Sequence, residues 1–240
     1  MPNWCENKLT VTGSSEEIKQ IRKCLLSKVP QTNEVILDFN CLISMPKAVQ
    51  IDCGSLGERS HFLLKKSKDA PFDDEVIEKL ISNEAKALSL SLRARQEGWT
   101  FGGFIQWLEQ SDIRQKELGF NLQLGRLYAK NLKKYNARHW YDWALSNWGC
   151  KWNATTRYID EENEHIICDF DTPWVPPENW FDSLCKEYPD LSLQLDYYEP
   201  GFNFAGSIKN DNGSSDHYQF NCDNKIREFT LSVFGYYFGD

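Results

Sequence analysis

The sequence lacks the features that would place a protein in a membrane or outside the cell. No apolar run approaches the roughly 18 residues that a membrane-spanning helix requires. The first seven residues contain neither the basic nor the apolar region of a secretory signal. The eight cysteines are dispersed and form no CxxC pair, which argues against a disulfide scaffold and against a zinc site. We therefore expect a cytoplasmic protein that uses no membrane, metal or cofactor.

Motifs of the common enzyme classes are also missing. The chain has no Walker loop, no GxGxxG, HExxH or GxSxG motif, and no deaminase signature. Two groups could still serve acid–base or metal chemistry: His139 with Asp142, which share a helical face, and the strand carboxylates Asp169, Asp171 and Asp196. A surface or capping pair and ordinary sheet polarity explain them more simply, because nothing marks an activated nucleophile. We expect a protein that is not an enzyme.

Charge is distributed unevenly along this globular chain of 240 residues, whose net charge is −8. Residues 150–240 contain 17 acids against 6 bases, whereas residues 74–138 contain 8 acids against 11 bases. The overall charge argues against nonspecific binding of nucleic acid by the whole surface. A local basic face and an acidic face directed at a basic partner both remain open.

Hydrophobic periodicity predicts strands and helices in a mixed order. Residues 7–13 alternate like a strand, Ser14 and Glu17 form a capping box before a helical pattern, and residues 35–39 read as a second strand. Beyond residue 150 the period changes to two, with a hairpin over 155–170. The predicted class is α+β, with split β-α-β elements at both ends and a helical insertion between them. We expect a single compact unit over 1–240, made of an N-terminal β-α-β part (1–50), a helical insertion (74–149) and a C-terminal part (150–240).

One segment of the expected insertion is basic. Residues 119–138 contain no acid, and a helix there places four cations on one face: Arg126, Lys130, Lys133 and Lys134. Apolar residues lie largely on the opposite face: Leu124, Leu127, Tyr128, Leu132 and Tyr135. The basic face is either simply solvated or contacts phosphates of a nucleic acid, in which case binding depends on salt.

Four of the nine tryptophans fall within residues 139–153. In one interpretation they pack against a sheet, and Gly149 ends their helix. In a second, an exposed platform with Lys151 as an anion anchor stacks a nucleobase; its rings are Trp143, Trp148, Trp152 and Trp174. A third interpretation is a protein-interface hot spot, where tryptophan is enriched.

These motifs resemble the YubB-type (Api-like) family of phage and plasmid proteins. The resemblance rests on four places along the chain: Met1-Pro2-Asn3-Trp4-Cys5 with Asn7, Trp140-Tyr141-Asp142-Trp143 running into Asn147-Trp148-Gly149-Cys150-Lys151-Trp152, Phe170-Asp171-Thr172-Pro173-Trp174 with Pro176-Pro177, and Glu199-Pro200-Gly201 with Phe204-Ala205-Gly206. Two positions depart from the family, which usually has Thr in place of Cys150 and Asp in place of Asn153. An acid that mattered chemically at the second position would be lost here.

The resemblance implies a ferredoxin-like α+β fold, in which the split β-α-β elements at both ends and the C-terminal part (150–240) are ferredoxin-like. It also implies a mobile-element origin, but no established activity. We therefore expect a non-enzymatic phage or plasmid accessory protein that binds a host or element partner. In one version it acts in counter-defence, with its acidic segment as a DNA-like decoy for a basic host protein. The alternative is a nucleic-acid or nucleotide binder that uses the Trp and Lys151 platform together with the basic helix.

Overall fold

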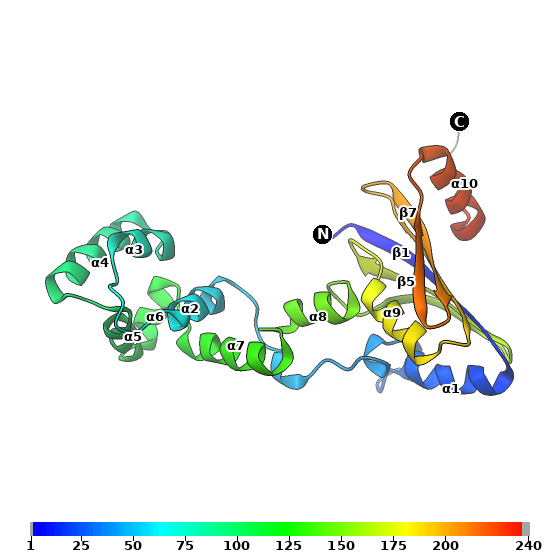
Figure 1. The fold of residues 1–240 in the computed structure, drawn as a ribbon, viewed down its shortest axis with the longest axis horizontal. Helices are drawn as coiled ribbons and strands as arrows, with labels where there is room; N and C mark the ends of the chain where they lie inside the picture. The colour runs from blue at the N-terminus through cyan, green and yellow to red at the C-terminus, as the bar shows by residue number, and fades with distance from the viewer. Residues whose placement is uncertain (1, 237–240) are drawn as a thin grey trace. The chain divides into compact units, whose positions relative to one another are not determined.

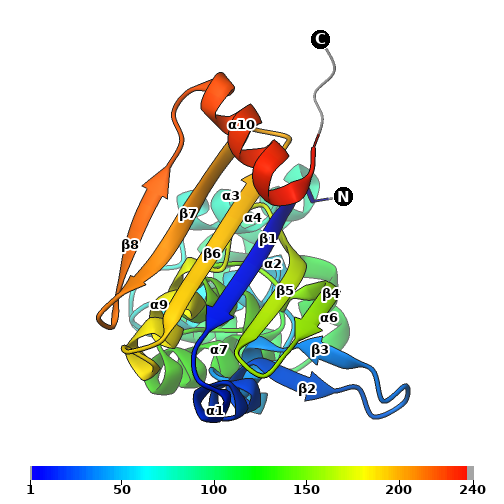
Figure 2. The ribbon, with the colours of Figure 1, turned by 90° about the vertical axis from the view of Figure 1, so that its right-hand side faces the viewer.

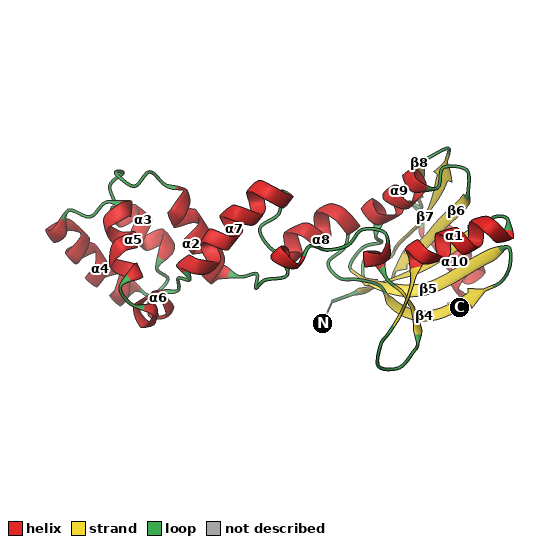
Figure 3. Ribbon diagram, turned by 90° about the horizontal axis from the view of Figure 1, so that it is seen from below, coloured by secondary structure: helices red, strands yellow, loops and turns green. Residues whose placement is uncertain are grey.

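The computed structural model describes residues 2–236. The chain folds as two compact units, Met1–Met45 with Ala144–Asp240 and Pro46–Trp143, and each is described by itself. We call them the sheet unit and the helical unit (Figures 1 and 3). The sequence suggested one compact unit with a helical insertion from residue 74. The helical unit starts earlier, because α2 (Ser55–Lys65) packs along α7 (Leu122–Tyr135).

The sheet unit contains a six-stranded sheet in the order β4-β5-β1-β6-β7-β8, in which every neighbouring pair is antiparallel (Figure 2). Its elements are β1 (Trp4–Thr12), α1 (Ser15–Leu25), β2 (Leu26–Lys28), β3 (Val35–Leu37), η1 (Phe39–Cys41), β4 (Thr155–Glu161), β5 (His165–Pro173), α9 (Glu178–Glu187), β6 (Ser192–Glu199), β7 (Phe204–Asp211), β8 (Ser214–Gln219) and α10 (Asp223–Phe234).

The strand order defines a ferredoxin-like fold. Strand β5 lies between β1 and β4, and β1 lies between β5 and β6. Because all neighbours are antiparallel, β1 runs parallel to β4, and β5 runs parallel to β6. Helix α1 follows β1, and α9 connects β5 to β6, so two split β-α-β units interleave. Strands β7 and β8 extend one edge. The predicted α+β, ferredoxin-like class is confirmed.

Residues 35–39 do not complete the N-terminal β-α-β part that the sequence predicted. Instead, β3 pairs with β2 in a separate two-stranded sheet. Side chains near the start of β4 bind this backbone: Thr156 Oγ1 accepts from the Leu37 N–H at 3.0 Å, and Asn153 Oδ1 accepts from the Phe39 N–H at 2.8 Å. Phe39 then turns into the core, where its ring lies 4.6 Å from that of Trp180. The parallel partner of β1 is therefore β4, more than 140 residues further along the chain.

Helix α1 forms where the local sequence pattern predicts a helix. The Ser14 hydroxyl caps the Glu17 N–H, and the Glu17 carboxylate accepts from the Ser14 N–H at 2.8 Å. The apolar stripe of Ile18, Ile21 and Leu25 is buried. Helices α1 and α9 cover one face of the sheet and α10 lies across the other (Figures 2 and 3).

The helical unit is built from short capped helices around an aromatic core. Its elements are η2 (Lys47–Val49), α2, α3 (Asp74–Leu80), α4 (Glu84–Glu97), α5 (Phe101–Glu109), α6 (Asp112–Leu118), α7 and the start of α8 (Trp140–Trp148). The rings of Phe72 and Phe104 stack at 4.0 Å in this core, and Phe120 meets Phe104 edge-on at 5.8 Å. The boundary between the two units falls within α8.

The buried side of α7 differs from the predicted apolar face. Leu122, Gly125, Tyr128 and Asn131 are buried, whereas Leu127 is 38% exposed. The cause is close packing, because a Cβ on Gly125 would lie 2.7 Å from Ser60 Cβ and 2.8 Å from the Ser60 carbonyl carbon. The glycine lets α2 approach the backbone of α7, and the buried stripe follows that contact.

We predict that Gly125→Ala destabilises the helical unit by about 1–3 kcal/mol, because the new methyl group meets fixed backbone. The matched control is Gly103→Ala within α5, where the nearest atom would be 3.8 Å away. Both changes improve helix propensity equally, so the control should be neutral or stabilising by up to about 1 kcal/mol. Urea unfolding followed by circular dichroism measures both; equal stability of the two variants would contradict the close packing.

Candidate functional site

Two of the proposed platform tryptophans lie in the core. Trp143 is 5% exposed and Trp148 is 3% exposed. Trp148 also donates its indole N–H to the Ile43 carbonyl at 3.1 Å. Helix α8 ends at Trp148, and Gly149 follows with a φ of 84°, the left-handed conformation of a C-cap. The first half of the Trp motif is therefore packed, and its rings are not a surface for a ligand.

The other half of the motif is exposed. Trp152 is 38% exposed and Trp174 is 42% exposed. Lys151 Nζ lies 4.5 Å from the centroid of the Trp152 ring. A third ring, that of Trp4, is 39% exposed and lies 6.1 Å from the ring of Trp152. Sequence reasoning missed Trp4, although its place in the strand alternation, in phase with Glu6 and not with the buried Cys5, was the signal.

A buried polar network holds the loop that carries Trp174. This residue has a φ of 73°, uncommon outside glycine, and its N–H donates to the Asn3 carbonyl at 2.9 Å. Just before it, the Thr172 hydroxyl donates to the Val175 carbonyl at 2.8 Å and accepts from Asn7 Nδ2 at 2.8 Å. Asn7 and Thr172 are both completely buried. The loop is thus fixed to the inner side of β1.

These loops gather at one end of the sheet because the strand register brings them together. Trp4 is paired with Pro173, and Glu199 is paired with Phe204. The buried Glu199 carboxylate accepts the N–H groups of Gly201 at 2.9 Å and Phe202 at 2.6 Å, and Phe202 is 72% exposed. We call this surface the aromatic end; it consists of Trp4, Lys151, Trp152, Trp174, Val175 and Phe202.

The strand carboxylates do share one face of the sheet, as the sequence suggested. Register places Lys8 between Asp169 and Asp196, and places Glu6 opposite Asp171. Each charge on this face has a neighbour: Lys8 Nζ lies 3.9 Å from Asp169 Oδ1, and the Gln194 amide donates to both oxygens of Asp196 at 2.9 and 2.8 Å. This face forms a polar network under α10. Lys8 Nζ also donates a hydrogen bond to the Val233 carbonyl of α10.

Arg157 links two acids on the same face. Its Nη1 lies 2.7 Å from Glu6 Oε2, and its Nε lies 3.3 Å from Asp171 Oδ1. Burial raises the pKa of Asp171 above its usual range, although Arg157 acts in the opposite direction. These contacts make Glu6 and Asp171 the ion-pair partners of Arg157.

The pair His139 and Asp142 belongs to a structural network of the helical unit. Arg138 binds the Asp142 carboxylate through Nε at 2.6 Å and Nη2 at 3.0 Å. Burial raises the pKa of Asp142, but the bonds from Arg138 outweigh this and lower it overall. His139 is 3% exposed, and its Nε2 lies 3.3 Å from Glu58 Oε1 on α2. The network fixes the start of α8 to α2.

Only part of the basic face of α7 is available for contact with phosphates. Arg126 forms an ion pair with Glu109 of α5, while Lys130, Lys133 and Lys134 are exposed. Lys134 Nζ lies 5.0 Å above the Tyr135 ring. This face lies in the helical unit and the aromatic end in the sheet unit, so the two surfaces that the alternative prediction combined belong to different units.

Among the residues that the structure describes, one group has the side chains and spacing of a metal site. It comprises Asp160, Glu162 and His165, at the turn between β4 and β5. His165 Nε2 lies 3.4 Å from Asp160 Oδ2 and its Nδ1 lies 3.9 Å from Glu162 Oε2, so contacts among the three side chains account for the group. The eight cysteines are free thiols. Within residues 2–236, no helix has both the length and the apolarity to cross a membrane.

The fold and the family model agree on an α+β protein with a ferredoxin-like domain. Residues 148–236, which include β4 to β8, match the family model described as a ferredoxin-like domain in Api92-like protein. The chain is also similar to the crystal structure of a protein api92 from Yersinia pseudotuberculosis, at 15% identity and a TM-score of 0.40, covering 92% of this chain and 100% of that one. None of the curated proteins matches. The family description states a fold and no activity.

We predict that Thr172→Val destabilises the sheet unit by about 1–3 kcal/mol, because the Asn7 amide and the Val175 carbonyl both lose a buried partner. It should also change the environment of Trp174 and thereby the fluorescence emission of the native protein. Thr12→Val, at an exposed position of β1, is the matched control and should stay within about 0.5 kcal/mol of wild type. Urea unfolding measures both; a Thr172→Val protein as stable as the control would refute the network.

Proposed function

We propose that this chain is a non-enzymatic accessory protein of a phage or plasmid that binds a basic partner protein through the aromatic end of its sheet unit. The observation that supports the proposal is the exposure of three tryptophans, Trp4, Trp152 and Trp174, on loops at one end of the sheet. Exposed apolar patches on soluble proteins mark interaction sites, and tryptophan is enriched among the residues that dominate binding energy.

Charge favours a basic protein over nucleic acid as the partner of this unit. The sheet unit has 22 acids against 11 bases, a net of −11. Such a field repels phosphates and attracts cationic surfaces. Lys151 adds one cation at the aromatic end, but it packs on the Trp152 ring. An acidic unit with an aromatic anchor therefore suits a partner whose basic surface surrounds an apolar pocket.

The finer version of this proposal is counter-defence in the host cytoplasm. A host protein that binds nucleic acid presents a basic surface, and the acidic sheet unit would occupy that surface as a decoy. The support is the charge difference between the units, because the helical unit carries 13 acids against 16 bases, a net of +3. The resemblance to phage and plasmid proteins supplies the biological setting.

We predict that replacing Trp4, Trp152 and Trp174 together with Ala abolishes partner capture. Loss of a single hot-spot tryptophan costs about 2 kcal/mol or more, which is roughly a 30-fold loss of affinity. Tyr158→Ala is the matched control, because Tyr158 is 58% exposed on β4 away from the aromatic end. Immobilised proteins are incubated with host lysate at low salt, and retained proteins are compared by mass spectrometry.

A protein retained by wild type and Tyr158→Ala but lost from the triple variant supports the proposal. The retained protein should be basic, and its binding should weaken at high salt. Circular dichroism confirms that the triple variant is folded. The same set of retained proteins for all three samples, or none at low salt, would contradict the proposal.

A second candidate function, binding of nucleic acid, is favoured by the exposed lysines of α7. Lys130, Lys133 and Lys134 lie on a helix without acids in the unit that carries net positive charge. Backbone phosphates are neutralised by such side chains with release of counterions. This candidate uses the helical unit and is independent of the aromatic end.

We predict that changing Lys130, Lys133 and Lys134 to Gln lowers the salt dependence of DNA binding. Three lost phosphate contacts reduce the slope of log K against log salt by about 2.7 for duplex DNA. The control changes the exposed lysines 19, 23 and 28 of the sheet unit to Gln, which alters net charge equally. Fluorescence anisotropy of a labelled duplex measures binding. Identical slopes for the two variants would exclude α7 as the contact surface.

A further inference from the structure

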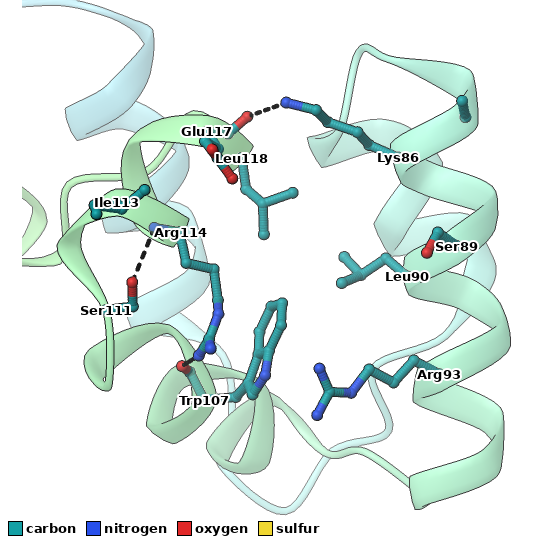
Figure 4. A pocket seen from close by; sticks show the side chains of 11 residues that line it. Lys86, Ser89, Leu90, Arg93, Trp107, Ser111, Ile113, Arg114, Glu117 and Leu118 are labelled. Carbon is teal, nitrogen blue, oxygen red and sulfur yellow. Dashed lines mark hydrogen bonds between the residues drawn. The ribbon is translucent and has the colours of Figure 1, made fainter.

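The helical unit contains a cationic cavity that the proposed function does not use. The cavity has a volume of about 560 Å³ and lies between α4 on one side and α5 and α6 on the other (Figure 4). Four of its lining residues dominate its chemistry: Lys86, Arg93, Trp107 and Arg114. Leu90 and Leu118 supply apolar wall.

One tryptophan ring in the lining of the cavity is contacted by two guanidinium groups. The guanidinium carbon of Arg114 lies 4.1 Å from the centroid of the Trp107 ring, and that of Arg93 lies 4.9 Å from it. Figure 4 shows Arg114 and Arg93 reaching the ring from opposite walls. Stacking on an aromatic face is favourable for each cation.

Both guanidinium groups are held in place before any ligand binds. Arg93 Nε is 2.7 Å from Glu97 Oε1, and Glu97 in turn accepts from the Trp99 indole at 2.8 Å. Arg114 donates through Nη1 to the Trp107 carbonyl. Within the described chain these hydrogen bonds engage one nitrogen of each guanidinium, a group that has five N–H donors. The remaining donors can bind an oxyanion in the cavity.

The rest of the lining fits an anion with an organic part. Lys86 adds a third cation and donates from Nζ to the Glu117 carbonyl at 2.9 Å. The Glu117 carboxylate is the one acid among the lining residues. The volume lies in the range of cavities that bind small organic ligands and exceeds what a bare phosphate needs. Arginine is the side chain best suited to bidentate recognition of phosphate.

We propose that this cavity binds a phosphorylated organic small molecule. Its phosphate group would bridge Arg93 and Arg114 at the edge of the Trp107 ring, with Lys86 as a further cation. Its organic part would lie against Leu90 and Leu118. The site lies wholly within the helical unit and does not rest on the proposed function, so either can fail without the other.

The test uses the full chain and three probes: adenosine monophosphate, adenosine and inorganic phosphate. Isothermal titration calorimetry should show saturable binding of the monophosphate, at least tenfold weaker binding of adenosine, and weakening of the monophosphate complex with salt. Arg93→Gln and Arg114→Gln should each weaken binding of the monophosphate at least tenfold, as expected for loss of a charge-assisted hydrogen bond. Arg95→Gln removes a charge from α4, the helix of Arg93, at a position outside the cavity. It should change the affinity for the monophosphate less than twofold.

A second variant covers the case in which the arginine variants do not fold. Ser89→Trp fills the cavity from an exposed position of α4 and leaves both arginines intact, so it should abolish binding of the monophosphate. Citrate serves as a polycarboxylate probe. The assignment would be overturned if the monophosphate showed no saturable binding, or if Arg95→Gln weakened its binding as much as the two cavity variants do. It would also be overturned if the Ser89→Trp protein bound the monophosphate as well as wild type does, or if citrate bound and neither phosphate probe did.

Discussion

The backbone pairing of β1 with two strands that follow the helical unit in the sequence is the constraint on which the sheet unit depends. β1 hydrogen-bonds to β5 along nine residue pairs and to β6 along seven. This pairing closes both split β-α-β units and brings residues 4–12 into the middle of a sheet that otherwise comes from residues 155–219. The long helical unit between β3 and β4 is compatible with this closure, because the entropic cost of closing a loop grows only slowly with its length.

The same register creates the candidate surface. It places the start of β1 beside the end of β5, so that Trp4 meets the segment that carries Trp174, and the buried Asn7 and Thr172 fix that segment. On the side of β1 opposite Asn7, alternation directs Glu6 and Lys8 into an ion-pair network. The same strand thus contributes Trp4 to the aromatic surface at its start and two charges to the face that follows.

The two units differ in charge and in the kind of site that they present. The sheet unit is acidic and exposes tryptophan rings supported by a rigid scaffold. The helical unit has net positive charge, and its cavity is lined by a lysine and by two arginines that contact one indole. Under the proposals above, each unit would attract a ligand of the opposite charge, a basic protein surface for the sheet unit and an anion for the helical unit.

Features of the fold that depend on local patterns can be predicted from the amino-acid sequence. The capping box at Ser14, the hairpin over 155–170 and the helix end at Gly149 follow from caps, alternation and glycine, which act within a few residues. Long-range packing sets two other features: β4 and not residues 35–39 is the parallel partner of β1, and Trp148 is buried while Trp152 is exposed. These outcomes depend on groups more than a hundred residues away, such as the Ile43 carbonyl that accepts the Trp148 N–H. Residue type and local periodicity do not specify such distant partners. Burial and strand order depend on tertiary packing, which overrides local propensity.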